Sequence, residues 1–214
     1  MPWLPFREPV SAATHFLWML LSLPGTLVLW RLSRGDLLKR IGVAVFGASL
    51  ALCYGASGLY HAVPDRISPP FATLDHVSIY LLIAGTVTPI GLVVLRGWWR
   101  VGLLSGIWLL AAVGIALRLT TELPVRQWTV LYLFMGWIGC TMYWELVRRV
   151  SRGKVRLILL GGLFYSVGAI INSIGWPNLE PPLFGPHELF HVFVMMGSLF
   201  HYYFMMRVVV PFQG

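Results

Sequence analysis

The segment that decides the fold runs from His187 to His201 and reads His-Glu-Leu-Phe-His-Val-Phe-Val-Met-Met-Gly-Ser-Leu-Phe-His. It is apolar and long enough to enter a membrane. His187 and His191 are one helical turn apart, so they share one helix face and both can bind one metal ion. Ionisable side chains are costly inside a membrane span, which makes each of them a candidate functional residue. The alternative is a pair of polar residues at a helix start that contact headgroups and water.

The composition of the whole chain points to a membrane protein. Of the 214 residues, 57% are hydrophobic and only 11% are charged, whereas about 25% are charged in a typical soluble domain. The two cysteines, Cys53 and Cys140, fall inside apolar segments, so no disulfide framework is expected. We therefore expect an integral protein of the lipid bilayer with almost no extramembrane domain.

Seven apolar segments are long enough, or nearly so, to cross a bilayer core, and continuous runs of this length form helices in lipid. Their predicted ranges are 12–30, 41–62, 74–95, 98–117, 127–147, 155–174 and 187–209. The predicted fold is all-α, a polytopic seven-transmembrane helix bundle that forms a single domain over residues 1–214. Pro24 and Pro89 lie inside the first and third segments, where proline bends a helix.

The distribution of basic residues predicts the orientation. The net charge of +8 comes from Lys and Arg in short loops, without the aromatic and basic surface that would suggest nucleic acid. Of the 16 basic residues, only Arg7, Arg66, Arg118 and Arg126 lie on the side of the N-terminus. The positive-inside rule thus places the N-terminus outside and the C-terminus in the cytoplasm. We expect the cell (inner) membrane of a prokaryote; the oligomeric state stays open.

Polar residues from several segments fall at one membrane level, because even segments end and odd segments begin on the same side. His61 ends the second segment, Asp75 and His76 begin the third, and His187 and His191 begin the seventh. Glu8 and His15 precede or begin the first segment on that side. Scattered polar residues would not gather in this way, so the sequence predicts a site there.

Three imidazoles from two helices, His61, His187 and His191, form the ligand set expected of a catalytic zinc site with an open fourth position. Asp75 could orient an imidazole, or hold a water molecule and act as a base. Ser57 precedes His61 by one turn and could bind that water or a substrate carbonyl. Its bland alternative is an intrahelical hydrogen bond.

Other polar residues are interpreted as structural. His187 and Glu188 begin an H-E-x-x-H pattern typical of metalloproteases, but Glu188 in a first helical turn also favours the helix dipole. His201 lies roughly 21 Å along the axis from His187, too far to share an ion. His76 points away from Asp75 and is expected near the site or at the interface. Asn172 is expected to bond to a neighbouring helix.

Several short motifs resemble the hemolysin III family, within the progestin and adipoQ receptor (PAQR) superfamily. The matching pieces are Ser57-Gly-Leu-Tyr-His61, Leu74-Asp75-His76, Tyr80-Leu-Leu-Ile-Ala-Gly-Thr86 with Thr88-Pro89, Met135-Gly-Trp137 and His187-x-x-x-His191. They occur in family order across all seven segments, and together they are specific.

The resemblance implies a seven-helix fold with zinc bound by one histidine at the end of helix two and two at the start of helix seven. Those positions are His61, His187 and His191 here. Ser57 and Asp75 match a set shared with alkaline ceramidases in a wider group of proposed membrane hydrolases. The resemblance therefore suggests hydrolysis of a lipid amide or ester bond.

Two departures from the relatives matter. Family members often carry Glu-x-x-Asn before the helix-one histidine, whereas here Glu8 is followed by Pro9-Val10-Ser11, which argues against a role for this region. The related adiponectin receptors keep zinc on the cytoplasmic side, whereas the loop charges here place the site outside.

The leading hypothesis is a membrane zinc hydrolase with a lipid-like substrate, in which His61, His187 and His191 hold Zn²⁺ and Asp75 and Ser57 are catalytic. One alternative is a receptor or signalling protein in which zinc is structural and joins helices two and seven. Another is a pore-forming, hemolysin-like protein, although no amphipathic pore-lining helix stands out in the sequence.

Overall fold

The computed structural model describes residues 6–180 and 184–213, with the side chain of Val125 left aside. Within these residues, the seven expected spans are confirmed. The first four spans are Pro9–Leu32 (α1), Leu37–Ala62 (α2), Pro69–Pro89 (α3) with Ile90–Val94 (η2), and Gly97–Thr120 (α4). The fifth span in chain order joins Val125–Trp137 (α5), Ile138–Met142 (η3) and Tyr143–Arg149 (α6), and the sixth is Arg152–Ile174 (α7). The last joins Pro186–Phe204 (α8) and Met205–Val209 (η4), and a short turn, Asp65–Ile67 (η1), precedes α3.

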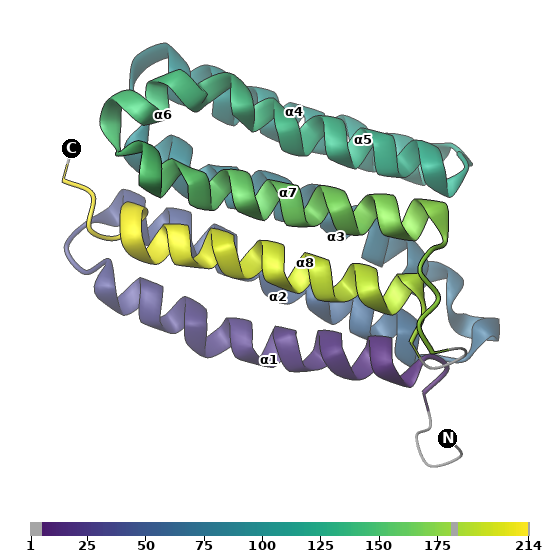
Figure 1. Cartoon of the computed structure of the whole chain (residues 1–214). Coiled ribbons are helices and arrows are strands. Elements are labelled where there is room, and N and C mark those ends of the chain that lie inside the picture. The colour runs from purple at the N-terminus through teal and green to yellow at the C-terminus, as the bar shows by residue number, and fades with distance from the viewer. Residues whose placement is uncertain (1–5, 181–183, 214) are drawn as a thin grey trace.

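The helices form one bundle of long, roughly parallel rods (Figure 1). Consecutive helices pack side by side, α1 on α2, α2 on α3 and α3 on α4, and α7 packs on α8. Contacts of α8 with α1 and of α5 with α3 and α7 close the ring. The N- and C-terminal ends lie at opposite ends of the bundle (Figure 1), as an odd number of spans requires. The end of α2 and the starts of α3 and α8 therefore meet at one end.

Two spans depart from a continuous α-helix. At Pro89 the α-helix of the third span ends and a π-helical turn, Ile90–Val94, follows, because proline has no N–H to donate. The expected irregularity at Pro89 is thus present as a change of helix type, whereas α1 continues past Pro24 to Leu32. The fifth span passes through a 3₁₀ turn between α5 and α6.

Small residues allow α7 and α8 to approach closely, as is common in the packing of membrane helices. A Cβ atom added to Gly161 would lie 3.0 Å from the carbonyl oxygen of Gly197, and one added to Gly197 would lie 3.1 Å from that of Gly161. The His201 ring fills the space beside Gly161. This close approach fixes α8, and hence its two N-terminal histidines, against its neighbour.

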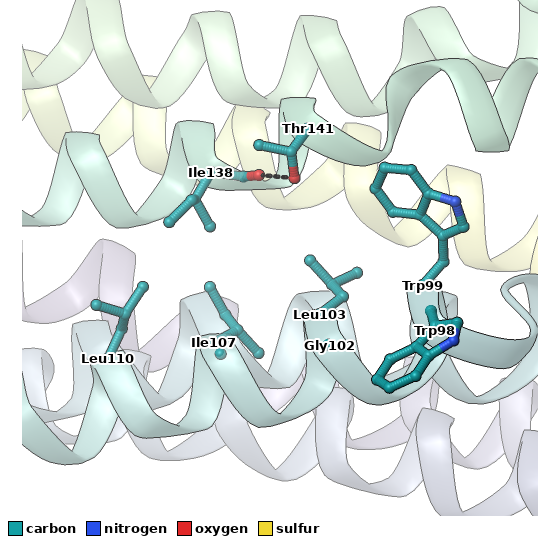
Figure 2. A pocket seen from close by; sticks show the side chains of 9 residues that line it. Trp98, Trp99, Gly102, Leu103, Ile107, Leu110, Ile138 and Thr141 are labelled. Carbon is teal, nitrogen blue, oxygen red and sulfur yellow. Dashed lines mark hydrogen bonds between the residues drawn. The ribbon is translucent and has the colours of Figure 1, made fainter.

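A groove of about 440 Å³ lies between α4 and η3, near the start of α4 and thus at the end of the bundle away from His61 (Figure 2). Its lining residues are Trp98, Trp99, Gly102, Leu103, Gly106, Ile107, Leu110, Ile138 and Thr141. Trp98 is 90% exposed, as an interfacial residue should be. Trp128, in contrast, is only 3% exposed and packs inside the bundle.

Candidate metal centre

The ends of two helices bring the three predicted histidines together. His61 lies in the last turn of α2, and His187 and His191 lie in the first two turns of α8. Pro186 begins α8, where its missing N–H costs nothing. Glu188 Oε2 accepts a hydrogen bond from the backbone N–H of Gly185 at 2.9 Å and so caps the helix start. The start of α8 is therefore well fixed.

The three imidazoles form a compact cluster. The centroid of the His61 ring lies 5.0 Å from the centroid of the His187 ring and 5.0 Å from that of the His191 ring. The centroids of His187 and His191 are 4.5 Å apart. One ligand nitrogen from each ring lies within 4.8 Å of the others. His61 and His191 are buried, and His187 is half-buried. The cluster could hold a metal ion, as the spacing in the sequence predicts.

Hydrogen bonds from outside the cluster fix the orientation of two of the rings. The Nδ1 atom of His61 lies 2.6 Å from Oε2 of Glu8, and the Nδ1 atom of His187 lies 3.1 Å from Oδ1 of Asn172. Both partners are oxygen acceptors, so each Nδ1 carries the proton and donates it. Metal-binding histidines usually donate their second ring N–H in this way.

When both rings are neutral, two lone pairs face each other. With Nδ1 protonated in each ring, Nε2 of His61 and Nε2 of His187 are both acceptors, and they lie only 3.3 Å apart. No proton of either neutral ring lies between them, so a cation between them would resolve the conflict. Nitrogens bound to one tetrahedral zinc at about 2.0–2.1 Å are about 3.3–3.4 Å apart. The distance between these two nitrogens therefore suits a zinc ion.

His15, near the start of the first span, packs against His191. Its ring stacks on that of His191 with centroids 3.7 Å apart and an interplanar angle of 23°. A histidine binds metal in the plane of its ring, so two nearly parallel stacked rings cannot both ligate one ion. His15 is buried, and neither of its ring nitrogens has a hydrogen-bond partner among the described residues. Its visible role is to hold the plane of His191.

Ser57 and Asp75, the two predicted catalytic residues, lie beside the cluster. Ser57 is 4% exposed and sits one turn before His61 on α2. The Asp75 carboxyl lies near the Ser57 side chain and within electrostatic range of His61. The structure thus places both residues near the histidine cluster, although it assigns them no chemical role.

The remaining polar residues have structural partners. Both carboxylate oxygens of Glu188 are engaged, one by Gly185 and the other by the Ser11 hydroxyl at 2.9 Å, which argues against a protease-like general base. His201 Nε2 lies 3.2 Å from the carbonyl oxygen of Ile158, so it is an interior hydrogen-bonding residue. His76 is not part of the histidine cluster; its Nδ1 accepts a hydrogen bond from Arg118.

The region around Glu8, whose role the changed motif puts in doubt, is in contact with the histidine cluster. Glu8 precedes α1 and its backbone N–H donates to the carbonyl oxygen of His61 at 3.0 Å, while its carboxylate bonds the ring of the same residue. The hydrogen bond to His61 lowers the pKa of the Glu8 carboxyl, so it is ionised at neutral pH. Arg7 pairs with Glu8 at 3.1 Å and with Asp65 at 3.0 Å, which ties the N-terminal segment to η1.

Asn172 was expected to bond to a neighbouring helix, and it does so by orienting His187. The signal that could have found Glu8 is its position at the same membrane level as the histidines. Its pairing with His61, 53 residues away, needs the folded bundle.

Comparisons with known proteins identify the family of this chain. The profile of the haemolysin-III related family matches residues 5–202. Hemolysin-3 from Bacillus cereus is 34% identical over 209 residues, which covers 96% of this chain and 93% of the relative. A hemolysin-3 homolog from Bacillus subtilis (strain 168) is 33% identical over 196 residues, covering 90% and 89%. The chain thus belongs to the haemolysin-III related family of multi-pass membrane proteins.

Proposed function

We propose that this protein is a zinc-dependent membrane hydrolase that cleaves an amide or ester bond of a lipid. The observation that carries the proposal is the pair of facing acceptors, Nε2 of His61 and Nε2 of His187, 3.3 Å apart with both Nδ1 atoms already engaged. His191 adds a third ligand, and three protein ligands are typical of catalytic zinc sites, whereas structural sites carry four.

Each residue would have a defined task in the hydrolysis. Zinc held by these three histidines would lower the pKa of a bound water to about 7 and would thereby supply a nucleophile. Asp75 accepts the proton of the attacking water and returns it to the leaving amine or alcohol. The Ser57 hydroxyl, which lies near Asp75, can donate a hydrogen bond to the substrate carbonyl. Glu8 and Asn172 keep the rings of His61 and His187 in place.

The position of the cluster supports a lipid as substrate. The spans around it are long and apolar, and the cluster lies at the ends of α2 and α8, where acyl chains meet headgroups. A hydrophobic substrate can enter sideways between helices. The loop charges favour an orientation in the cell membrane with the cluster on the outer side.

A hydrolysis screen tests the proposal. Purified protein is incubated with ceramides, other lipid amides and lipid esters, and fatty acid release is measured. Asp75→Asn is expected to lower the rate about 10²–10⁴-fold while the metal is retained. Glu122→Gln is the matched control, because Glu122 is an exposed acid at the same end of the bundle and lies outside the cluster. Full activity in Asp75→Asn would refute the mechanism.

The printed name of the Bacillus cereus relative, hemolysin-3, favours membrane lysis as a second candidate function. Release of a dye from liposomes on addition of the protein tests it. Leakage that persists in His191→Ala would separate lysis from the metal centre, whereas no leakage at any protein concentration would remove this candidate.

A further inference from the structure

Arg118 directs its side chain into the bundle although it lies in the last turn of α4. Its Nε donates a hydrogen bond to Nδ1 of His76, on α3, at 3.0 Å. Its guanidinium carbon lies 5.6 Å from the centroid of the Trp128 ring, on α5, which is 3% exposed. These two contacts on two neighbouring helices hold the guanidinium in a fixed plane.

The positive charge of Arg118 is not balanced by an acid. None of the carboxylates in residues 6–180 and 184–213 forms an ion pair with it. The guanidinium has five N–H donors, and only Nε has a hydrogen-bond acceptor within this part of the chain. The other N–H donors of this half-buried guanidinium are therefore able to bind an anion at this end of the bundle.

Simple snorkelling to the headgroups does not account for this placement, because a snorkelling side chain extends outward into the interface. Arg126 behaves in that way: it lies at the same end of the bundle and is exposed. Arg118, in contrast, packs on a buried tryptophan and on a histidine of the central helix α3.

His76 links Arg118 to the metal centre. It lies within electrostatic range of both Arg118 and His187, and it follows Asp75 on α3. The hydroxyl of Tyr132 donates to the backbone carbonyl of His76 at 3.4 Å and braces this part of α3 against α5. An anion held by Arg118 would therefore lie on the α4–α5 side of the histidine cluster, at the same membrane level.

We propose that Arg118, fixed by His76 and Trp128, binds the oxyanion of an anionic lipid beside the metal centre. A planar guanidinium matches phosphate and carboxylate oxygens with paired hydrogen bonds, so both groups suit the site. The assignment of that lipid as substrate rests on the proposed hydrolase function; the binding itself does not.

The test is equilibrium binding of radiolabelled dodecyl phosphate to the zinc-loaded protein in an uncharged detergent. Competitors are dodecyl phosphate, dodecanoate, dodecanol and inorganic phosphate. The two charged amphiphiles are expected to compete at least about tenfold better than dodecanol, since hydrogen bonds to charged groups are strong. Their relative potency tells phosphate from carboxylate. Equal competition by dodecanol would overturn the anion site, and equal competition by inorganic phosphate would overturn its assignment to a lipid.

Variants locate the binding to Arg118. Arg118→Gln is expected to weaken dodecyl phosphate binding about tenfold or more with its zinc content unchanged, whereas Arg126→Gln should bind as the wild type does. Wild-type affinity in a folded Arg118→Gln would refute the proposal. If Arg118→Gln does not fold, Arg118→Lys keeps the charge but loses the paired hydrogen bonds, and it should bind more weakly than wild type. Binding without any lipid hydrolysis would contradict the hydrolase proposal and leave the anion site standing.

Discussion

The Nδ1 atom of His61 lies 2.6 Å from Oε2 of Glu8, so the segment before the first helix reaches the end of the second and orients a ring of the histidine cluster. Arg7 extends this connection to η1 through Asp65. The N-terminal segment is thus part of the candidate metal centre, and the metal affinity should depend on it.

Glu8→Gln removes the negative charge behind His61 and weakens its hydrogen bond. Loss of such a partner typically lowers metal affinity about 10–100-fold. A competition titration with a zinc-binding dye measures the change. Glu122→Gln serves as the control, because Glu122 is an exposed acid at the same end of the bundle. Equal affinities of Glu8→Gln and wild type would show that Glu8 does not support the ligand.

The stack of His15 on His191 predicts a difference between two substitutions. His15→Ala removes a buried ring and should destabilise the fold by about 2–3 kcal/mol. His15→Phe keeps a flat ring and removes two nitrogens that lack partners among the described residues, so its stability should equal or exceed that of wild type. Unfolding in detergent measures both. A loss in His15→Phe as large as in His15→Ala would mean that the ring nitrogens bind something.

Metal removal should loosen the contact between α2 and α8, because the ligands come from both helices. An ion present at about 100 times its dissociation constant stabilises the folded state by about 2.7 kcal/mol. Chelation should therefore lower the thermal midpoint of wild type but not of His61→Ala. An identical response in both proteins would indicate that the chelator acts elsewhere. Metal-dependent stability without turnover of any lipid would favour a structural metal.

The glycine contact between α7 and α8 gives a packing prediction. Gly161→Ala places a methyl group 2.3 Å from the His201 ring and should destabilise the bundle by about 1–3 kcal/mol. Gly106→Ala, in the middle of α4, meets nothing within 4 Å and should be neutral or slightly stabilising. Thermal unfolding of the two variants in detergent makes the comparison. Equal stability of both would show that α7 and α8 are not held at this point.

The spans could be predicted from the sequence because lipid requires long apolar helices, and the predicted ends differ from the observed ones by only a few residues. The sequence also predicts that His61, His187 and His191 lie at the same depth in the membrane, because that depends only on counting the spans. Which face each residue turns to its neighbours depends on packing. The stacking of His15 on His191 and the burial of Trp128 could therefore not be predicted from the sequence.

The residues that orient the histidines also depend on packing, so the sequence did not predict their contacts in full. Asn172 was expected to bond across helices, but its contact with His187 depends on how close α7 and α8 approach at their glycines. The sequence puts a role for Glu8 in doubt, because the residues that follow it differ from a motif common in the family. The carboxylate reaches His61 all the same, since the contact needs one residue at the right level and not the whole motif.

The central claim is that His61, His187 and His191 bind zinc. Its most direct test is the metal content of protein purified in detergent without chelators, for wild type and for the double variant His61→Ala/His187→Ala, by elemental analysis. The account predicts about one zinc per wild-type chain and none in the double variant, which loses two of three ligands. Wild-type protein that is folded and contains no metal, or a double variant that keeps its zinc, would contradict the account.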